Sequence, residues 1–304
     1  MATKAQDVGR SGGILRLIHS PPVLGLTALG ITLLWKPVAH ALTVTLHGLL
    51  TGNVQYLVAT LIGLAGFALV WQGFKRDELT ATCMGYMGGA FIWIGWFEYA
   101  FDFFAEFLEV PPLMQDGYVF FTPNLLMIEA SAVLYLAILI FTGANKDTRC
   151  RMFLWFHRNF RLRPNQPTPG YKRQFARIAA METIFISWFF YLVIILACDP
   201  RIFGPQHPVT YAIFAAMIVW GVYLVGFKLI KYRAMAPAIR YAIATAGVIW
   251  FCIELTSLWG WYTEIWVKPA EFPLSNLMLL AGFLTVGIAA NMTRQRGGGE
   301  EVAA

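Results

Sequence analysis

The amino-acid sequence predicts an all-α integral membrane protein of about eight transmembrane helices, built as two tandem parallel four-helix repeats. Three observations favour this fold class: a strongly apolar composition, eight apolar stretches of spanning length, and an ordered series of matches between the two halves of the chain. The predicted halves are residues 1–143 and 178–304. A basic cytoplasmic linker with an interfacial helix is expected to join them over residues 144–177.

The composition is that of a chain surrounded by lipid. Hydrophobic residues make up 58% of the 304 residues and charged residues 13%, whereas about a quarter of the residues in a typical soluble domain are charged. Many of the Trp and Tyr residues lie near the ends of apolar runs, where their rings settle at the headgroup level. The first twenty residues lack the features of a removable signal peptide, so the first helix is expected to act as an uncleaved signal anchor.

The first half supplies four of the predicted spans. About 20 apolar residues are needed to cross roughly 30 Å of hydrocarbon. The stretches that approach or exceed this length lie near residues 22–46, 54–74, 82–108 and 123–143. Pro37 is expected to kink the first span, because proline cannot donate a backbone hydrogen bond. The pairs Lys75-Arg76 and Pro111-Pro112 separate the later spans.

The second half supplies the other four spans, near residues 179–198, 209–229, 239–264 and 273–291. Asp199-Pro200 and Gly204-Pro205 separate the first two, and Pro269 separates the last two. Turn-forming and helix-breaking residues of this kind mark the ends of helices.

Lysine and arginine residues predict the orientation, because loops rich in them stay in the cytoplasm. Those on one side of the predicted spans are Lys4, Arg10, Arg16, Lys75, Arg76, the nine between Lys146 and Arg177, Lys228, Lys231, Arg233, Arg240, Arg294 and Arg296. The other side has Arg201 and Lys268, and Lys36 lies within the first span. We therefore expect a multi-pass protein of the inner (cytoplasmic) membrane with both termini cytoplasmic. The net charge of +6 is explained by topology and does not indicate nucleic-acid binding.

The linker is the one long loop that the sequence predicts. Residues 150–161 mix aromatic side chains with Arg, which is typical of an interfacial helix lying on anionic lipid. Pro164 and Pro169 break this helix. Two interpretations stay open: a solvated linker whose charges set the topology, or a docking surface for a cytoplasmic partner at residues 150–177.

An internal repeat relates the second, third and fourth spans to the sixth, seventh and eighth. The matched pairs are Val54/Val209, Tyr56/Tyr211, Gly73/Gly226, Tyr86/Tyr241, Trp93/Trp250, Glu98/Glu254, Glu106/Glu264, Pro111/Pro269 and Asn124/Asn276. The offset between partners drifts from 152 to 158 residues, so small gaps are required. Because each half has an even number of spans, a pseudo-two-fold axis along the membrane normal should relate the halves, and sites tend to lie at such a repeat interface.

Ionisable side chains inside the predicted spans are the candidates for function, because each costs at least a few kcal/mol in hydrocarbon. Glu98, Asp102 and Glu106 are spaced i, i+4 and i+8 and form one stripe on a helix face. At about 1.5 Å per residue, Glu98 lies roughly 15 Å deep, near the midplane. Its repeat partner Glu254 lies at a similar depth, and Glu129 is a further candidate within the fourth span.

Lys36 is the expected counter-charge, because its depth in the first span matches that of Glu98 and Asp102. Three interpretations stay open. The charges form a purely structural ion pair; they couple to a proton, a cation or a cofactor; or Lys36 snorkels beside protonated carboxyls. We expect Glu98 to face the protein interior, either paired with Lys36 or exposed to a polar cavity.

His40 and His47 are the candidate cofactor ligands. They share one helix face but lie about 10 Å apart along the axis, too far for one metal ion. Haem bound within the membrane would need His ligands paired across helices; the alternative is a hydrogen-bonding role in helix packing. The four cysteines lie far apart without a CxxC pattern. No metal site is predicted, and the cofactor stays unassigned.

Three functions remain open. No phosphate-binding, nucleophile-elbow, zinc-protease or dinucleotide-binding motif occurs, which favours a chain that is not catalytic by itself. The first hypothesis is a membrane subunit of a larger complex of the redox or oxidase type, acting in electron transport and contributing a cleft for a quinone or pigment. The second is a proton- or cation-coupled transporter or channel that uses the midplane carboxylates. The third is a membrane enzyme acting on lipid.

Overall fold

The computed structural model describes residues 20–143, 157, 170 and 172–292. These residues divide into two compact units. One unit, called here the helical unit, consists of the residues up to Ala100 together with those from Phe175 onward. The other, called here the hairpin unit, consists of Phe101–Gln174.

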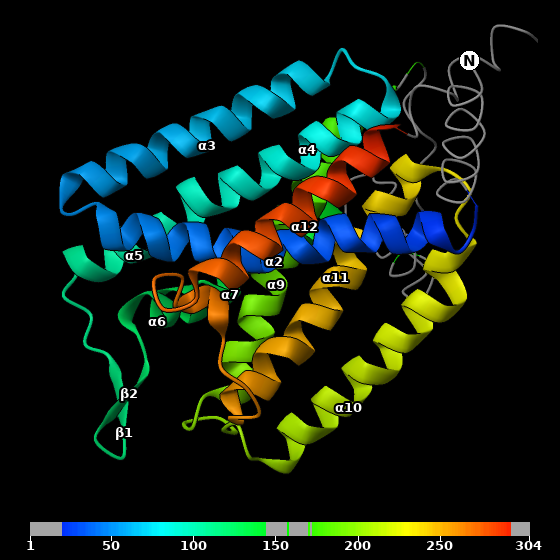
Figure 1. Ribbon diagram of the computed structural model, residues 1–304. Helices are drawn as coiled ribbons and strands as arrows, with labels where there is room; N and C mark the ends of the chain where they lie inside the picture. Colours follow the sequence, from blue (N-terminus) through cyan, green and yellow to red (C-terminus); the bar gives the residue numbers. More distant parts are fainter. Residues whose placement is uncertain (1–19, 144–156, 158–169, 171, 293–304) are drawn as a thin grey trace, which may run out of the picture. The chain divides into compact units, whose positions relative to one another are not determined.

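Long helices make up the helical unit (Figure 1). They are α2 (Val23–Leu49), α3 (Asn53–Gly73), α4 (Glu78–Ile92), α9 (Phe175–Cys198), α10 (Pro208–Tyr223), α11 (Met235–Leu258) and α12 (Pro273–Met292). A π-helical turn, η1 (Trp93–Glu98), continues α4 and leads into α5 (Tyr99–Phe107). Short segments η2 (Leu224–Lys228), η3 (Leu229–Lys231) and η4 (Ile265–Val267) complete the unit.

The hairpin unit holds the remainder of α5, a two-stranded sheet and two helices. Strand β1 (Leu113–Gln115) pairs antiparallel with β2 (Tyr118–Phe121), and α6 (Pro123–Ala130) and α7 (Ala132–Gly143) follow. The turn between the strands is Asp116-Gly117, and both residues have positive φ angles of 52° and 83°. Asp-Gly is a favoured sequence for such a two-residue hairpin turn, because both positions require positive φ.

Six described helices are long and apolar enough to span a membrane: Val23–Leu49, Asn53–Gly73, Phe175–Cys198, Pro208–Lys231, Met235–Leu258 and Pro273–Ala290. A seventh span results if α6 and α7, which are bent by 42° relative to each other, are counted as one. The prediction of a helical chain with several membrane-spanning segments is therefore confirmed, with six to seven candidate spans among the described residues. The predicted span 82–108 is divided among α4, η1 and α5 and is not among the six.

The seventh predicted span is wrong in its boundaries, because α11 covers residues 235–258 instead of 239–264. Gly260 adopts a positive φ of 77° just beyond the helix end. The Gly260 N–H donates to Ser257 O at 2.7 Å, and the Trp261 N–H donates to Thr256 O at 3.1 Å. This pair of bonds is the Schellman motif, which ends a helix at a residue with positive φ.

Small residues allow the helices of the helical unit to approach closely. Figure 1 shows α3 running alongside α4, while α10 packs against α11; α4 also packs on α9, and α2 packs on α11 and α12. A Cβ atom added to Gly85 would lie 2.2 Å from Ala176 O, and one added to Gly89 would lie 2.7 Å from the Ala180 Cα. Such close contacts are typical of helix pairs in membranes, where small residues form the interface.

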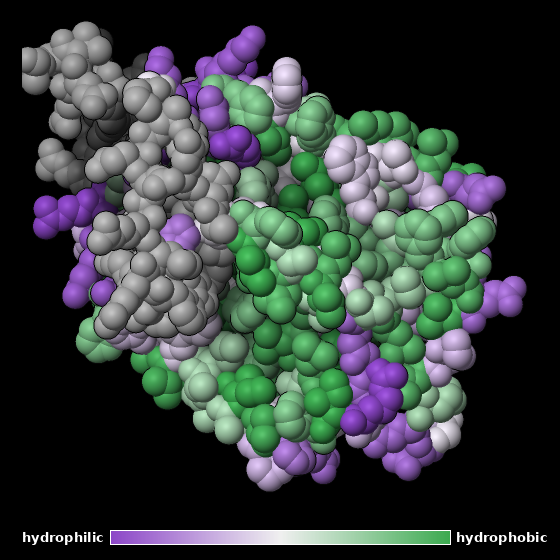
Figure 2. Space-filling model, turned by 180° about the vertical axis from the view of Figure 1, so that it is seen from behind, coloured by the Kyte–Doolittle hydropathy of each residue, from purple (hydrophilic) through white to green (hydrophobic). Residues whose placement is uncertain are grey.

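The helices differ in how much of their surface is covered. In the most apolar stretch of α11, 56% of the residues are buried inside the protein. In the corresponding stretch of α12, only 6% are buried. Hydrophobic side chains cover much of the described face in Figure 2, with hydrophilic residues mostly towards its edges. These exposed apolar surfaces are consistent with contact to the lipid bilayer.

Candidate functional site

A small cavity lined by both apolar and polar side chains lies inside the helical unit. Its lining comes from α2 (Thr32, Trp35, Lys36, Ala39, His40 and Thr43), α4 and η1 (Tyr86, Ala90, Trp93, Ile94 and Glu98), α9 (Thr183, Ile186, Ser187 and Tyr191) and α11 (Ile243). The volume is about 40 Å³. Since a water molecule needs about 10–15 Å³ of such space, the cavity holds a few waters or a small ion. It is too small for a quinone, a haem or a carotenoid.

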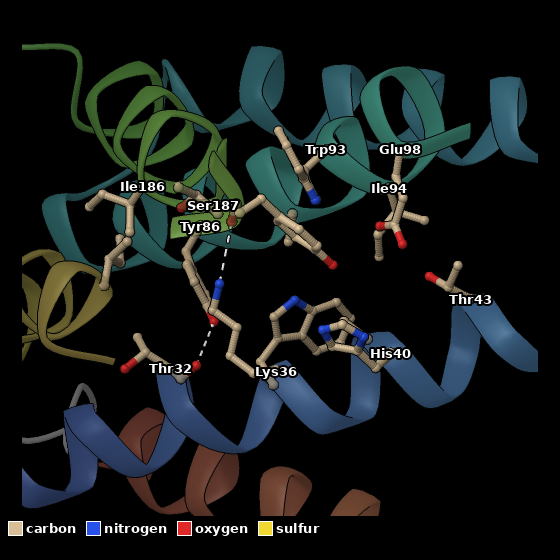
Figure 3. A pocket seen from close by; sticks show the side chains of 16 residues that line it. Thr32, Lys36, His40, Thr43, Tyr86, Trp93, Ile94, Glu98, Ile186 and Ser187 are labelled. Carbon is tan, nitrogen blue, oxygen red and sulfur yellow. Dashed lines mark hydrogen bonds between the residues drawn. The ribbon is translucent and has the colours of Figure 1, made fainter. Parts of the chain in front are cut away.

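Helix α2 carries one polar side of the cavity. Thr32, Lys36, His40 and Thr43 follow one another at three- or four-residue intervals, so they share one helix face. Figure 3 shows Thr32 at one end of the cavity and Thr43, with Glu98, at the other. Local structure fixes the Thr32 end, because Tyr86 Oη donates to Thr32 O at 3.1 Å and Thr32 Oγ1 contacts Ala242 O at 3.2 Å.

Lys36 lies in the middle of this face. Its Nζ donates to Ser187 Oγ on α9 at 3.3 Å (Figure 3). Its charge also interacts with the carboxylates of Glu254 and Glu98. The lysine thus donates to a hydroxyl and interacts electrostatically with two carboxylates, one of which is Glu98, the counter-charge that the sequence suggested.

Glu254 of α11 stands beside the cavity, next to its lining residue His40. The distance between His40 Nε2 and Glu254 Oε1 is 3.5 Å. The His40 ring also stacks on Trp250 with centroids 5.6 Å apart, and the Trp250 side chain hydrogen-bonds Glu254. These contacts hold the imidazole and the carboxylate in one orientation relative to Lys36.

A column of aromatic rings crosses the cavity. Trp93 stacks on Tyr191 with centroids 5.6 Å apart, and Tyr191 lies 6.4 Å from His40, which in turn stacks on Trp250. The four rings come from η1, α9, α2 and α11. Aromatic contacts at these separations are stabilising. The column therefore joins four helices and surrounds the charged groups with rigid apolar walls.

Glu98 is the last residue of the π-helical turn η1. Figure 3 shows its carboxylate pointing towards α2, near His40 and Thr43. The Thr43 hydroxyl is buried and has no hydrogen-bond partner within the described part of the chain. Buried polar groups need partners, so this end of the cavity suits a water molecule or an ion.

The other predicted residues lie outside the cavity lining. Asp102 on α5 and Glu129 on α6 belong to the hairpin unit, whereas the lining comes from the helical unit. His47 lies near the end of α2, where its Nδ1 is 3.0 Å from Thr43 O and its ring stacks on Tyr99 at 4.5 Å. This is the packing role that the sequence allowed as the alternative to a cofactor ligand.

Beyond the end of α11, Glu264 adds a half-buried acid near the same groups. Burial raises the pKa of its carboxyl above the ordinary value, while a hydrogen bond with Ser257 acts in the opposite direction. Its charge interacts with that of Glu254. Acidic groups therefore continue from the cavity towards this end of the helical unit.

Sequence reasoning missed the contribution of α9. Ser187 and Tyr191 sit in the part of the span over residues 183–198 that has no charged residue, so nothing local distinguishes them. A signal was nevertheless present, because α2 and α9 share a pattern at a constant offset of 151 residues. The pairs are Ala28/Ala179, Thr32/Thr183, Lys36/Ser187 and His40/Tyr191.

Within the described ranges, no group of three or more His, Cys, Asp or Glu side chains is arranged to hold a metal ion. The chain matches no protein-family model, no curated protein and no solved structure.

Proposed function

We propose that this chain is a proton- or cation-coupled transporter or channel whose working site is the cavity between α2, α4 and α9. The observation that carries the proposal is the position of the partly buried Lys36 near two carboxylates, Glu98 and Glu254, beside a space for a few waters. Ionisable groups placed in this way within a membrane mark ion pathways and proton relays.

The charge balance of the site favours uptake of one cation. Lys36 supplies one positive charge, whereas Glu98 and Glu254 supply two negative charges when both are ionised and His40 is neutral, so these groups together carry a net charge of −1. A net charge held away from water is costly. A proton or a monovalent cation would remove this cost, and the cavity of about 40 Å³ has room for either.

The tandem repeat is part of the proposal, and the residues of α2 and α9 support it. Thr32 and Thr183 both line the cavity, and both donate to the carbonyl oxygen four residues earlier, at 3.2 Å and 2.8 Å. Lys36 contacts its counterpart Ser187, and His40 lies against its counterpart Tyr191. Equivalent residues meet in this way on a two-fold axis, so the axis would pass through the cavity.

The packing of helices between the two proposed halves is also consistent with a two-fold relationship. Helix α2 packs on α11 of the other half, while α9, the counterpart of α2, packs on α4, the counterpart of α11. The α4 and α11 helices also contact each other. The first helix of each half thus packs on the third helix of the other half. This pattern favours two parallel halves related by an axis along the membrane normal.

The π-helical turn accounts for one step of the drift in the repeat offset, from 157 residues at Trp93/Trp250 to 156 at Glu98/Glu254. Five residues separate Trp93 from Glu98, whereas four separate Trp250 from Glu254. A π-helical turn holds one residue more than an α-helical turn, and η1 covers Trp93–Glu98. The extra residue is thereby absorbed, and Glu98 and Glu254 can occupy equivalent positions.

The proposal includes eight spans and the orientation derived from the charges. The continuous helical segment from Glu78 to Phe107 would be the eighth span, since its 30 residues at about 1.5 Å each are long enough. Both termini and residues 144–177 would face the cytoplasm, as the positions of Lys and Arg favour.

A second candidate is a membrane subunit of a larger complex with a lipophile-binding cleft. An apolar groove of about 380 Å³ between α10, η2 and α11 favours it, lined by residues that include Met217, Gly221 and Cys252. Ligand pockets commonly measure about 300–1,000 Å³. A quinone or pigment would therefore belong in this groove and not in the charged cavity.

Proton flux into proteoliposomes tests the first candidate. Purified chain is reconstituted with an internal pH-sensitive dye, and a membrane potential is imposed with and without an external alkali cation. Wild-type vesicles should show flux above empty vesicles, and Glu254→Gln should lower it by about tenfold or more. Glu271→Gln removes an exposed carboxylate paired with Lys268 and should leave the flux unchanged. Equal flux in wild-type and empty vesicles under every gradient would contradict the proposal.

A further inference from the structure

A second cluster of charged side chains ties α4, α9 and α11 together. Arg240 of α11 donates to Glu78 Oε1 at 2.6 Å and to Thr82 Oγ1 at 2.7 Å, both on α4. Its guanidinium also lies 4.7 Å from the ring centroid of Phe175 on α9. One side chain therefore holds three helices at a common level.

This cluster adjoins the Thr32 end of the cavity. Tyr86 lies one turn after Thr82 on α4, and Ile243 lies one turn after Arg240 on α11; both line the cavity. One helical turn corresponds to about 5.4 Å. Figure 3 shows Tyr86 at the same end as Thr32, away from Glu98. Arg240 thus stands about one turn outside the cavity.

Glu182 on α9 is adjacent in the helix to residues of the cavity lining and also interacts with the cluster. The next residue, Thr183, and the residue one turn later, Ile186, both line the cavity. The Glu182 carboxyl interacts electrostatically with Arg240. Helices α3 and α10, which also pack on α9, have no charged residue. Arg240 and Glu78 are the charged groups that α11 and α4 place near this carboxyl, and α2, which meets α9 at Ser187, adds Lys36.

The hydrogen bonding of Glu182 is incomplete. Its Oε2 is buried and has no hydrogen-bond partner among the residues that the structure describes. A buried acceptor without a partner costs about 1–3 kcal/mol, and Glu78 already supplies the direct carboxylate partner of Arg240. A purely structural role would therefore be filled at lower cost by an apolar residue.

We propose that Glu182 passes protons between the Arg240 cluster and the cavity, an inference that rests on the proposed function of the cavity. In the first step Glu182 Oε2 takes a proton from a hydronium ion at the Arg240 end: one O–H bond of hydronium breaks, an O–H bond forms on the carboxyl, and a water molecule is left. In the second step the carboxyl O–H bond breaks and the proton passes to a water molecule in the cavity, which becomes hydronium. The carboxylate is restored beside Arg240, and the hydroxyls of Thr32, Thr183 and Tyr86 line the path towards Glu98 and Glu254.

Proton flux in proteoliposomes made from the full chain tests this role. Glu182→Gln removes the titratable proton and should lower the flux by about tenfold or more. Glu182→Asp keeps a carboxyl and should retain most of the flux, as should the exposed control Glu271→Gln. Wild-type flux in Glu182→Gln, together with loss of flux in Glu254→Gln, would overturn the relay and leave the proposed function standing. No flux in the wild type would contradict both.

A second variant decides the question if Glu182→Gln does not fold. Glu182→His replaces the carboxyl by a group that titrates near pH 6.5. The pH at which flux is half-maximal should then shift towards that value. An unchanged pH profile in a folded, conducting Glu182→His protein would overturn the relay.

Discussion

At the scale of single residues, Lys36 and Glu98 set the charge of the cavity in opposite directions. Glu98→Gln removes the surplus negative charge, so it should weaken cation uptake and raise the cation concentration, or lower the pH, at which flux is half-maximal. Lys36→Met leaves both carboxylates without their ammonium, so it should shift the same midpoint the other way. If both variants shift the midpoint of flux in the same direction, the charges form a structural ion pair. Removing either partner would then impair the fold instead of changing the charge of the cavity.

Glu264 gives a pH-dependent stability that can be separated from transport. Because burial raises the pKa of this acid in the folded chain, the folded state binds the proton more tightly than the unfolded state. The stability from this group is present below its ordinary pKa of 4.5 and is lost as the pH rises through the folded value. Glu264→Gln should therefore raise the melting temperature at neutral pH and not at acidic pH. A difference that is independent of pH would contradict this explanation.

The sequence singled out the charged members of the proposed site together with His40, and it missed the members that carry only a hydroxyl group. A charge inside an apolar run is visible without a structure, which is why Lys36, Glu98 and Glu254 were singled out. The roles of Ser187 and Tyr191 depend on α9 lying against α2, a tertiary contact that local pattern does not report. Glu182 was missed because it stands near the basic end of its span.

At the scale of helices, Gly85 controls the contact between α4 and α9. A Cβ atom at Gly85 would lie 2.2 Å from Ala176 O, so Gly85→Ala must push the two helices apart. Overpacking of this kind costs about 1–3 kcal/mol, and the melting temperature should fall. Gly287→Ala is the matched control, because no atom lies within 4 Å of its added Cβ. Equal melting temperatures for the two variants would contradict the close packing of α4 on α9.

The sequence predicts the long helices better than it predicts the π-helical turn and the β-hairpin that lie between them. Long apolar runs predict spans reliably, and six of the expected eight are long, apolar helices in the structure. The π-helical turn Trp93–Glu98 has no local sequence signal apart from the drift of the repeat offset. The Asp116-Gly117 turn did have a hairpin signal, but its strands of three and four residues are too short for a clear alternating pattern.

At the scale of the whole molecule, function would depend on where the proposed repeat is not symmetric. The threonine pair Thr32/Thr183 is preserved between α2 and α9, whereas Lys36 faces Ser187 and His40 faces Tyr191. A strictly symmetric site would bring two lysines together and repel the cation. The replacement of one lysine by serine leaves a single ammonium between two carboxylates.

The most direct test of the central claim is infrared difference spectroscopy of the purified chain in lipid nanodiscs, recorded between acidic and alkaline pH. Alkali cations are omitted, so that the proton is the only cation that can enter the cavity. The proposed cavity chemistry predicts a buried-carboxyl band that shifts on hydrogen–deuterium exchange. This band should lose intensity in Glu98→Gln and Glu254→Gln and be unchanged in Glu271→Gln. If the spectra of Glu98→Gln and Glu254→Gln match the wild-type spectrum in this band, the claim that these carboxylates bind the proton in the cavity is contradicted.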